Sequence, residues 1–311
     1  MRLTRIIGSL VIVVVGYFFT TTIVRNWERV REMDYAVSTE AALVVLLFVL
    51  AVMVSGLLWG RVFAAVAHKQ VAATEAVRCH LASWVLKYVP GQIGGLIYKV
   101  RWAECVGGSR YAGAVAYGYE LLFLTLSSTL VVIPVLILVA SHDHAVPLLM
   151  AYAGLVAVLF GLGQRAPYQL ARRVVQRLTG GEPRSVGRLG MGSILVFSAW
   201  FMLPRLINAV GFVVLAASMF PVTPQMYVLL GASYILAGII GIYAFFVPSG
   251  IGVREAMIVA FASMIFPLEE AIVLSLVARL YATVADGVLG AAYLLLNRQK
   301  NEEPRVGENV P

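Results

Sequence analysis

Charged side chains within long apolar stretches are the first candidates for chemistry in this sequence. The nine residues concerned are Lys87, Lys99, Arg101, Arg205, Arg254, Arg279, Glu120, Glu255 and Asp286. A charge at the centre of a bilayer costs roughly 2.5 to 3.5 kcal/mol on insertion scales, so such residues indicate function. Six are basic and three acidic, so pairing among them leaves three positive charges in excess. A phosphate-bearing ligand would supply the missing negative charge, and arginine suits forked contacts to phosphate. If Lys99 and Arg101 instead snorkel to the interface, the excess is smaller.

Helix-breaking residues interrupt two of the apolar stretches. Residues 246–255 read FVPSGIGVRE and lie inside the apolar segment 227–266. The segment 81–103 is interrupted in the same way around Pro90 and Gly91. Proline removes a backbone donor, and glycine permits conformations that a helix excludes. In lipid, irregular backbone is tolerated only where protein buries it or where it lines a watery cavity, so both breaks indicate re-entrant half-helices at a binding site.

The two breaks can be written over each other without a gap. Residues 88–95 (YVPGQIGG) and 246–253 (FVPSGIGV) share a valine, a proline, an isoleucine and the glycine after the isoleucine. If the breaks enter from opposite faces of the membrane, they form an inverted-topology pair. Short apolar strings with proline and glycine also match by chance, so the repeat is a hypothesis.

The composition is that of an integral membrane protein. The 311-residue chain is 60% hydrophobic and 13% charged, with a mean hydropathy of +0.87, whereas a soluble domain averages about 25% charged residues. The formal charge of +8 would suit nucleic acid, but the basic residues lie largely between the apolar stretches. We therefore expect loops that face anionic lipid and no nucleic-acid partner. Cys79 and Cys105 form no disulfide framework and are expected to be buried or on the cytoplasmic side.

The apolar segments predict an all-α membrane protein with about six full transmembrane helices and two re-entrant helical hairpins. We expect the full spans over residues 6–24, 41–66, 111–140, 146–162, 191–220 and 268–296, and the hairpins over 81–103 and 227–266. Residues 1–296 would form one domain, followed by a polar, disordered cytoplasmic tail over 297–311. The loop 165–188 holds six arginines against one glutamate, which places it and both termini in the cytoplasm.

Each break would aim a helix N-terminus at the membrane interior. Half-helices that begin after Gly94 and after Gly252 would present free N–H groups and the positive end of the helix dipole, which bind anions. The predicted substrate site combines these ends with the charged residues. Its members are Lys87, Tyr88, Pro90, Gly91, Gln92, Gly94, Arg101, Glu120, Arg205, Asn208, Pro248, Ser249, Gly250, Gly252, Arg254, Glu255, Arg279 and Asp286.

These residues resemble the lysylphosphatidylglycerol synthase transmembrane (flippase-like) family. The strings that carry the resemblance are KYVPG at 87–91 and PSGIGVREA at 248–256, with Arg101, Gly107 and Glu120 between them. The resemblance covers most of the chain and implies a membrane domain that moves lipids with charged or glycosylated headgroups across the bilayer. In bifunctional relatives a soluble aminoacyl-transferase domain follows, so we expect the translocase part alone here. Ser249 departs from the family pattern, in which a second glycine is common. Its hydroxyl would either donate to a headgroup oxygen or cap the following half-helix.

The sequence leaves open the partners of Arg254, Arg279 and Asp286. Arg254 either contacts an anionic headgroup or pairs with Glu255, Asp286 or Glu120. Arg279 and Asp286 are seven residues apart, hence on one helix face but two turns separated, so each needs a partner on another helix.

Each of the other candidate site residues also has a second possible role, which is structural for most of them. Arg205 and Asn208 share a helix face and either line a cavity or make interhelical hydrogen bonds. Glu120 is either a proton-coupling carboxylate or half of a structural ion pair. Lys87 and Tyr88 either bind phosphate or anchor at the interface.

We expect neither an enzyme nor a metal site. The sequence contains no His-Glu-x-x-His, Gly-x-Ser-x-Gly or phosphate-loop motif. Residues 142–144 read HDH, but a short loop of this kind offers too few ligands for zinc. We therefore expect no cofactor.

The sequence as a whole favours a lipid translocase that moves an anionic, aminoacylated or glycosylated headgroup through a central polar cavity. The alternatives are a small-anion or ion-coupled secondary transporter and a non-catalytic accessory subunit of a membrane glycan or lipid synthase. A lateral opening wide enough for a lipid tail would favour the translocase. The expected substrate is a phospholipid or polyprenyl-linked lipid, the candidate protein partner is a membrane synthase or glycosyltransferase, and the expected location is the cell membrane.

Overall fold

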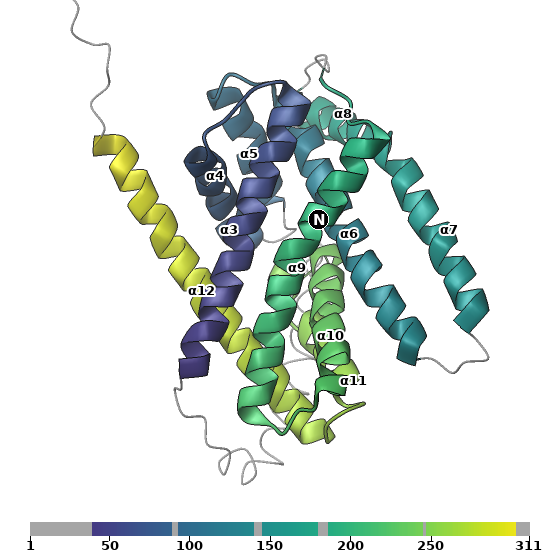
Figure 1. Cartoon of the computed structure of the whole chain (residues 1–311). Coiled ribbons are helices and arrows are strands. Elements are labelled where there is room, and N and C mark those ends of the chain that lie inside the picture. Colours follow the sequence, from purple (N-terminus) through teal and green to yellow (C-terminus); the bar gives the residue numbers. More distant parts are fainter. Residues whose placement is uncertain (1–38, 89–92, 140–144, 180–185, 245–246, 303–311) are drawn as a thin grey trace, which may run out of the picture.

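A computed structural model describes residues 39–88, 93–139, 145–179, 186–244 and 247–302, and every regular element within them is helical (Figure 1). This confirms the all-α membrane fold. The elements are α3 (Thr39–Ala67), α4 (Ala73–Val85), η1 (Leu86–Tyr88), α5 (Gly94–Cys105), α6 (Arg110–Val139), α7 (Ala145–Gly163), α8 (Ala166–Thr179), α9 (Met191–Met219), α10 (Pro224–Tyr243), η3 (Pro248–Gly250), α11 (Val253–Ala262) and α12 (Leu268–Glu302).

Five of the described helices are long and apolar enough to cross a membrane, namely α3, α6, α9, α10 and α12. Four of them match predicted full spans. The fifth, α10, was predicted as one arm of a hairpin, yet its 20 residues extend about 30 Å, the thickness of a hydrocarbon core. The predicted span 146–162 corresponds to α7, which reaches the criterion only together with α8, across a bend of 49°.

Three segments are more helical than the sequence analysis predicted. The first hairpin begins at Ala73 rather than at residue 81, and α12 continues to Glu302 into the predicted tail. Within the predicted loop 165–188, α8 forms an amphipathic helix that buries Ala171 and Val175 and exposes Arg172, Arg173 and Arg177. The segment is as rich in charge as a loop, but its charged residues are spaced so that they share one side of a helix. The other side is apolar and packs against α6.

Several predicted features fall outside the described residues. They are the first span at 6–24, the break residues 89–92, the HDH sequence at 142–144 and the end of the tail at 303–311.

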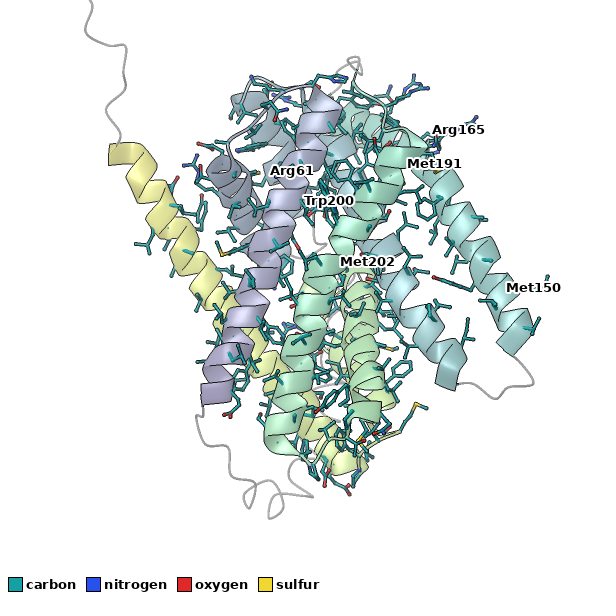
Figure 2. All side chains as sticks on the ribbon, in the orientation of Figure 1. Arg61, Met150, Arg165, Met191, Trp200 and Met202 are labelled. Atoms are coloured by element: carbon teal, nitrogen blue, oxygen red, sulfur yellow. The ribbon has the colours of Figure 1, made fainter. Side chains whose placement is uncertain are left out.

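Helices α3 and α9 lie side by side and run antiparallel. Near one end Arg61 lies over the ring of Trp200, at 5.6 Å from the centroid (Figure 2). Near the other end the Phe48 ring lies only 2.9 Å from the place where a Cβ on Gly211 would be. Because α3 leads directly into the first hairpin and α9 into the second, the two hairpins enter from opposite ends of the bundle (Figure 1).

The breaks of the two hairpins meet inside the bundle. The short helix η1, which precedes the first break, contacts η3, which forms part of the second. This is the arrangement that an inverted pair requires, and the internal repeat itself stays a prediction.

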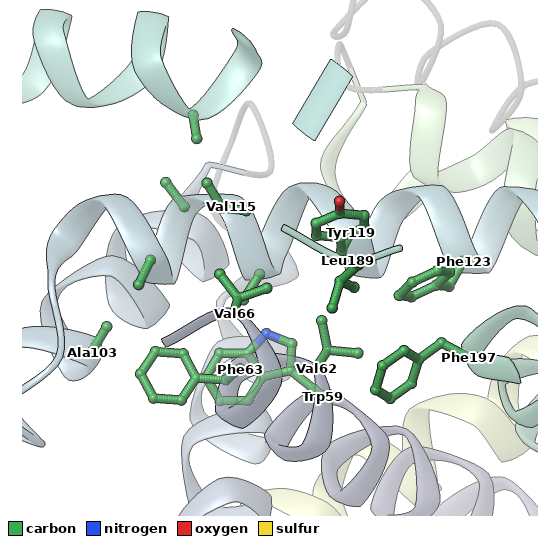
Figure 3. Packing of buried hydrophobic residues seen from close by; sticks show 14 of the residues in the cluster. Trp59, Val62, Phe63, Val66, Ala103, Val115, Tyr119, Phe123, Leu189 and Phe197 are labelled. Atoms are coloured by element: carbon green, nitrogen blue, oxygen red, sulfur yellow. The ribbon is translucent and has the colours of Figure 1, made fainter. Parts of the chain in front are cut away.

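Two large hydrophobic clusters hold the hairpins in place. One gathers α3, α6 and α9 with the first hairpin around Trp59, Phe63 and Tyr119 (Figure 3). The other gathers α3, α9 and α12 with the second hairpin around Phe212 and Tyr234. Each hairpin therefore packs mainly on its own apolar cluster.

The second break depends on left-handed backbone. Ser249, Gly250 and Gly252 have φ angles of 53°, 64° and 86°. Glycine adopts this region freely, whereas a residue with a Cβ is strained there by roughly 1–2 kcal/mol. A Cβ on Gly250 would also lie 2.8 Å from the Cα and carbonyl oxygen of Gly241 on α10.

We predict unequal stability changes at neighbouring positions of this break. Gly250→Ala should lower the thermal midpoint of the detergent-solubilised protein because of strain and the clash with Gly241. Ser249→Gly should leave stability within about 1 kcal/mol of wild type, because relief of the left-handed strain is offset by loss of the Arg279 contact and by the flexibility of glycine in the unfolded chain. Gly154→Ala, in an open helical position of α7, is the control and should be neutral or slightly stabilising. Tryptophan fluorescence during heating measures all three, and equal midpoints for Gly250→Ala and wild type would contradict the break geometry.

Candidate functional site

A polar cavity of about 180 Å³ lies where the two breaks meet. Helices α3, α4, α5, α6, α9, α10, α11 and α12 all contribute to its wall. Of the residues predicted from the sequence, those in the wall are Lys87, Glu120, Arg205, Asn208, Ser249, Arg254 and Asp286. The cavity is therefore built from both hairpins and from the helices around them.

Lys87 beside the first break is bound to α12. Its Nζ lies 2.8 Å from Oδ1 and 2.7 Å from Oδ2 of Asp286. The indole of Trp84 donates to the same Oδ1 at 2.7 Å, and the ammonium of Lys87 lies 4.1 Å from the centre of the Trp84 ring. The carboxylate of Asp286 is therefore neutralised inside the protein.

Lys99 is fully buried and is bound to α6 and α4. Its Nζ donates to Glu120 Oε2 at 2.6 Å and lies 3.1 Å from His80 Nδ1. The ring of Trp59 lies beneath the ammonium at 4.6 Å. Glu120 is thus part of an internal ion pair, and Lys99 does not snorkel to the surface.

The second break is bound to α12 as well. Arg279 lies 3.5 Å from Glu255 Oε1 through one terminal nitrogen and 3.5 Å from Ser249 Oγ through the other. The other oxygen of Glu255 accepts the backbone N–H of Gly252. Glu255 therefore occupies the N-terminus of α11, so the expectation of a free anion site there is not met. Ser249 does not cap α11, because Gly252 is the residue in the capping position.

Within the part of the chain that the structure describes, Arg205 and Arg254 are left without a carboxylate. The three acids available to Arg254, namely Glu255, Glu120 and Asp286, are bound to Arg279, Lys99 and Lys87. The guanidinium of Arg254 instead lies over the Tyr234 ring at 4.5 Å, and Arg205 Nε is buried without a hydrogen-bond partner in the described part of the chain.

The wall of the cavity carries a net positive charge. Its basic residues are Lys87, Lys99, Arg205 and Arg254, and its acidic residues are Glu120 and Asp286. With His80 neutral, two positive charges are in excess, and both belong to the arginines. This charge favours an anion, and two guanidinium groups can offer it several charge-assisted hydrogen bonds.

Other predicted residues lie outside the cavity wall. Arg101 is exposed. Gly94 begins α5, and its neighbour Gly95 is the residue that lines the cavity. The side chains of Tyr88 and Pro248, and residues 90–92, lie outside what the structure describes.

Several residues of the cavity wall were not predicted from the sequence, among them His80, Trp84 and Tyr117. His80, Trp84 and Lys87 follow one another at spacings of four and three, the pattern of one helix face. This signal was available, but a hairpin taken to begin at residue 81 excludes the histidine.

An apolar groove of about 530 Å³ adjoins the polar cavity. Helices α6, α9 and α10 form it, and Ile235 lines both the groove and the cavity. On α9, Arg205 and Asn208 face the cavity while Leu206 and Val210 face the groove. A polar compartment and an apolar one are therefore joined side by side.

Residues 5–290 of the chain match the family described as the lysylphosphatidylglycerol synthase TM region. Every residue that lines the cavity lies within this range. No curated protein matches the chain.

Proposed function

The chain belongs to the family of lysylphosphatidylglycerol synthase transmembrane regions, and from this membership we propose that it is a lipid translocase. The family indicates a lipid-related function in the membrane. The proposed activity is more specific than this. An anionic, aminoacylated or glycosylated headgroup passes through the polar cavity while the hydrocarbon chains stay in the bilayer.

The observation that supports the proposal is that Arg205 and Arg254 have no carboxylate partner among the described residues. Burying an unpaired charge is costly, and membrane proteins place such charges where they face a substrate path. The described acids near the cavity are already paired, so a phosphate group on a lipid is a suitable partner for Arg205 and Arg254. Contact with the headgroup is therefore favoured over permanent pairing for Arg254.

We predict that Arg254→Ala and Arg205→Ala each slow lipid translocation by tenfold or more. Loss of a charge-assisted hydrogen bond costs about 1.5–3 kcal/mol, which corresponds to roughly ten- to hundredfold in rate. The measurement is transbilayer movement of fluorescent phosphatidylglycerol and of a polyprenyl-phosphate lipid in reconstituted vesicles. Arg61→Ala is the matched control, since Arg61 lies on the Trp200 ring outside the cavity wall. Unchanged rates in both cavity variants would remove the site from the mechanism.

The apolar groove favours a lipid over a small anion. A carrier for a small anion needs only the polar cavity, whereas a lipid also needs an apolar path for its chains. The groove between α6, α9 and α10 supplies such a path, and it reaches the cavity wall at Ile235.

We predict that Val210→Trp, which fills the groove, slows translocation of a lipid with two long chains more than that of a short-chain analogue. Val210 is 52% exposed, so the larger ring does not have to enter a packed core. Leu203→Trp, on the same helix, also 52% exposed and outside the groove, is the control. Uptake of glycerol phosphate by wild-type vesicles, together with no effect of Val210→Trp on lipid movement, would favour the small-anion carrier.

We further propose that the bundle end with α8 faces the cytoplasm of a cell with this protein in its plasma membrane. The exposed arginines of α8 and Arg188 support this orientation through the positive-inside rule. The end of α3 lies at the same end of the bundle, since Val66 accepts the backbone N–H of Gly187. Tyr111 at the start of α6 is hydrogen bonded to Tyr168 of α8. Cys105, at the end of α5, precedes α6 closely in the chain and so lies there too (Figure 1).

The native cysteines can test this orientation. Cys105 is exposed and Cys79 is buried, so a membrane-impermeant maleimide should label inside-out vesicles at Cys105 and leave intact cells unlabelled. Cys105→Ser should abolish the labelling. Labelling of intact cells, lost in Cys105→Ser, would reverse the orientation.

A further inference from the structure

His80 belongs to a buried cluster that the proposed headgroup contacts do not use. Its Nδ1 lies 3.1 Å from Lys99 Nζ and 3.4 Å from Glu120 Oε1. Lys99 is joined to the other oxygen of Glu120 at 2.6 Å. The exposed fractions of His80, Lys99 and Glu120 are 4%, 1% and 5%, and all three line the cavity.

The surroundings of Nδ1 contain both a donor and an acceptor. The ammonium of Lys99 has only donors, so Nδ1 accepts from it and the neutral ring carries its hydrogen on Nε2. The same Nδ1 also faces a carboxylate oxygen of Glu120, which can only accept. A proton from the water of the cavity can bond to Nδ1, and the ring then donates to Glu120 Oε1. Lys99 gives up its contact with the ring and keeps Glu120 Oε2, and the cluster changes from neutral to singly positive.

Burial of the ring and the adjacent ammonium of Lys99 oppose this proton, and the other charged groups around the cavity add to or reduce that opposition. Helix α3 places the uncharged Ser55, Gly56 and Trp59 beside the cluster. Among the described residues, further titratable side chains near it are Cys79 of α4, Tyr117 of α6, Arg205 of α9, Tyr234 of α10, Arg254 of α11, and the pair of Lys87 with Asp286. The arginines oppose another positive charge while they are uncompensated. An anion bound to them removes this opposition, so anion and proton each favour the binding of the other.

The cluster also joins the elements that form the first hairpin. His80 lies on α4, Lys99 on α5 and Glu120 on α6, against which α5 packs. A proton on Nδ1 exchanges the contact between α4 and α5 for one between α4 and α6. Protonation of His80 therefore changes the contacts that hold the first hairpin in place.

We propose that the cluster of His80, Lys99 and Glu120 is a proton-binding site coupled to occupation of the cavity by an anionic headgroup. The inference rests on the proposed function and adds the coupling ion to it. Nε2 of His80 is buried without a hydrogen-bond partner among the described residues, which leaves a further donor for water in the cavity. With one proton per lipid, a gradient of one pH unit supports a lipid asymmetry of up to about tenfold, because one pH unit corresponds to about 1.4 kcal/mol.

His80→Asn is the sharpest test of this site. The amide oxygen of asparagine can replace Nδ1 as the acceptor for Lys99, but the side chain does not take up a proton near neutral pH. His68→Asn is the matched control, because His68 lies outside the cavity wall and its left-handed φ of 50° suits asparagine. Wild type and both variants are reconstituted with fluorescent phosphatidylglycerol, the membrane potential is clamped with valinomycin and potassium, and a pH difference of one unit is imposed.

We expect lipid asymmetry to develop in wild type and in His68→Asn, and to be lost in His80→Asn. A pH dye inside wild-type vesicles should report proton entry only when anionic lipid is present. This measurement tests the coupling of proton to lipid even if His80→Asn does not fold. Wild-type lipid movement without any response to the gradient, or a full response in His80→Asn, overturns the coupling alone. Absence of lipid movement in wild type under every condition overturns the proposed function and the coupling with it.

Discussion

The structure depends on one constraint: charges and irregular backbone inside a bilayer must find their partners within the protein. Helix α12 meets this constraint for both breaks. Asp286 binds Lys87 beside the first break, and Arg279 contacts Ser249 and Glu255 at the second. These contacts lie on one helix two turns apart, so α12 holds the tips of both hairpins together. They also occupy the acids that would otherwise have neutralised Arg254.

The cavity follows from this pairing. With Asp286 and Glu120 bound to lysines, the positive excess is concentrated on Arg205 and Arg254. The apolar groove adjoins the same wall, so a charged compartment and a hydrocarbon compartment share one boundary at Ile235. A lipid has the same division between headgroup and chains. This match supports the proposed translocase more directly than the charge alone, since a small anion would leave the groove without a role.

The second break also shows why position 249 would suit a glycine. Ser249 has a left-handed backbone, as its neighbour Gly250 does, and a glycine would adopt this conformation without strain. The serine hydroxyl lies near Arg279 and on the cavity wall rather than at the cap of α11. Its surroundings therefore suit contact with a headgroup, whereas the cap is made by Gly252 and Glu255.

The sequence by itself determined four of the long apolar helices and the positions of the two breaks, because hydropathy and the backbone limits of proline and glycine are local properties. Long apolar runs predicted α3, α6, α9 and α12, and the two Pro/Gly strings located both breaks. The sign of the buried charge excess could also be predicted, but its size could not: Arg101 is exposed, and the excess in the cavity wall is two rather than three. The tertiary structure decided which charge meets which: Lys87 and Asp286 are 199 positions apart, and no pattern along the chain indicates that Lys99 rather than Arg254 binds Glu120. It also brought His80 into the site and made α8 a helix, because both depend on which face a neighbouring helix covers. Pairing of charges inside a membrane is a property of the folded arrangement, and here it decides which arginines remain available.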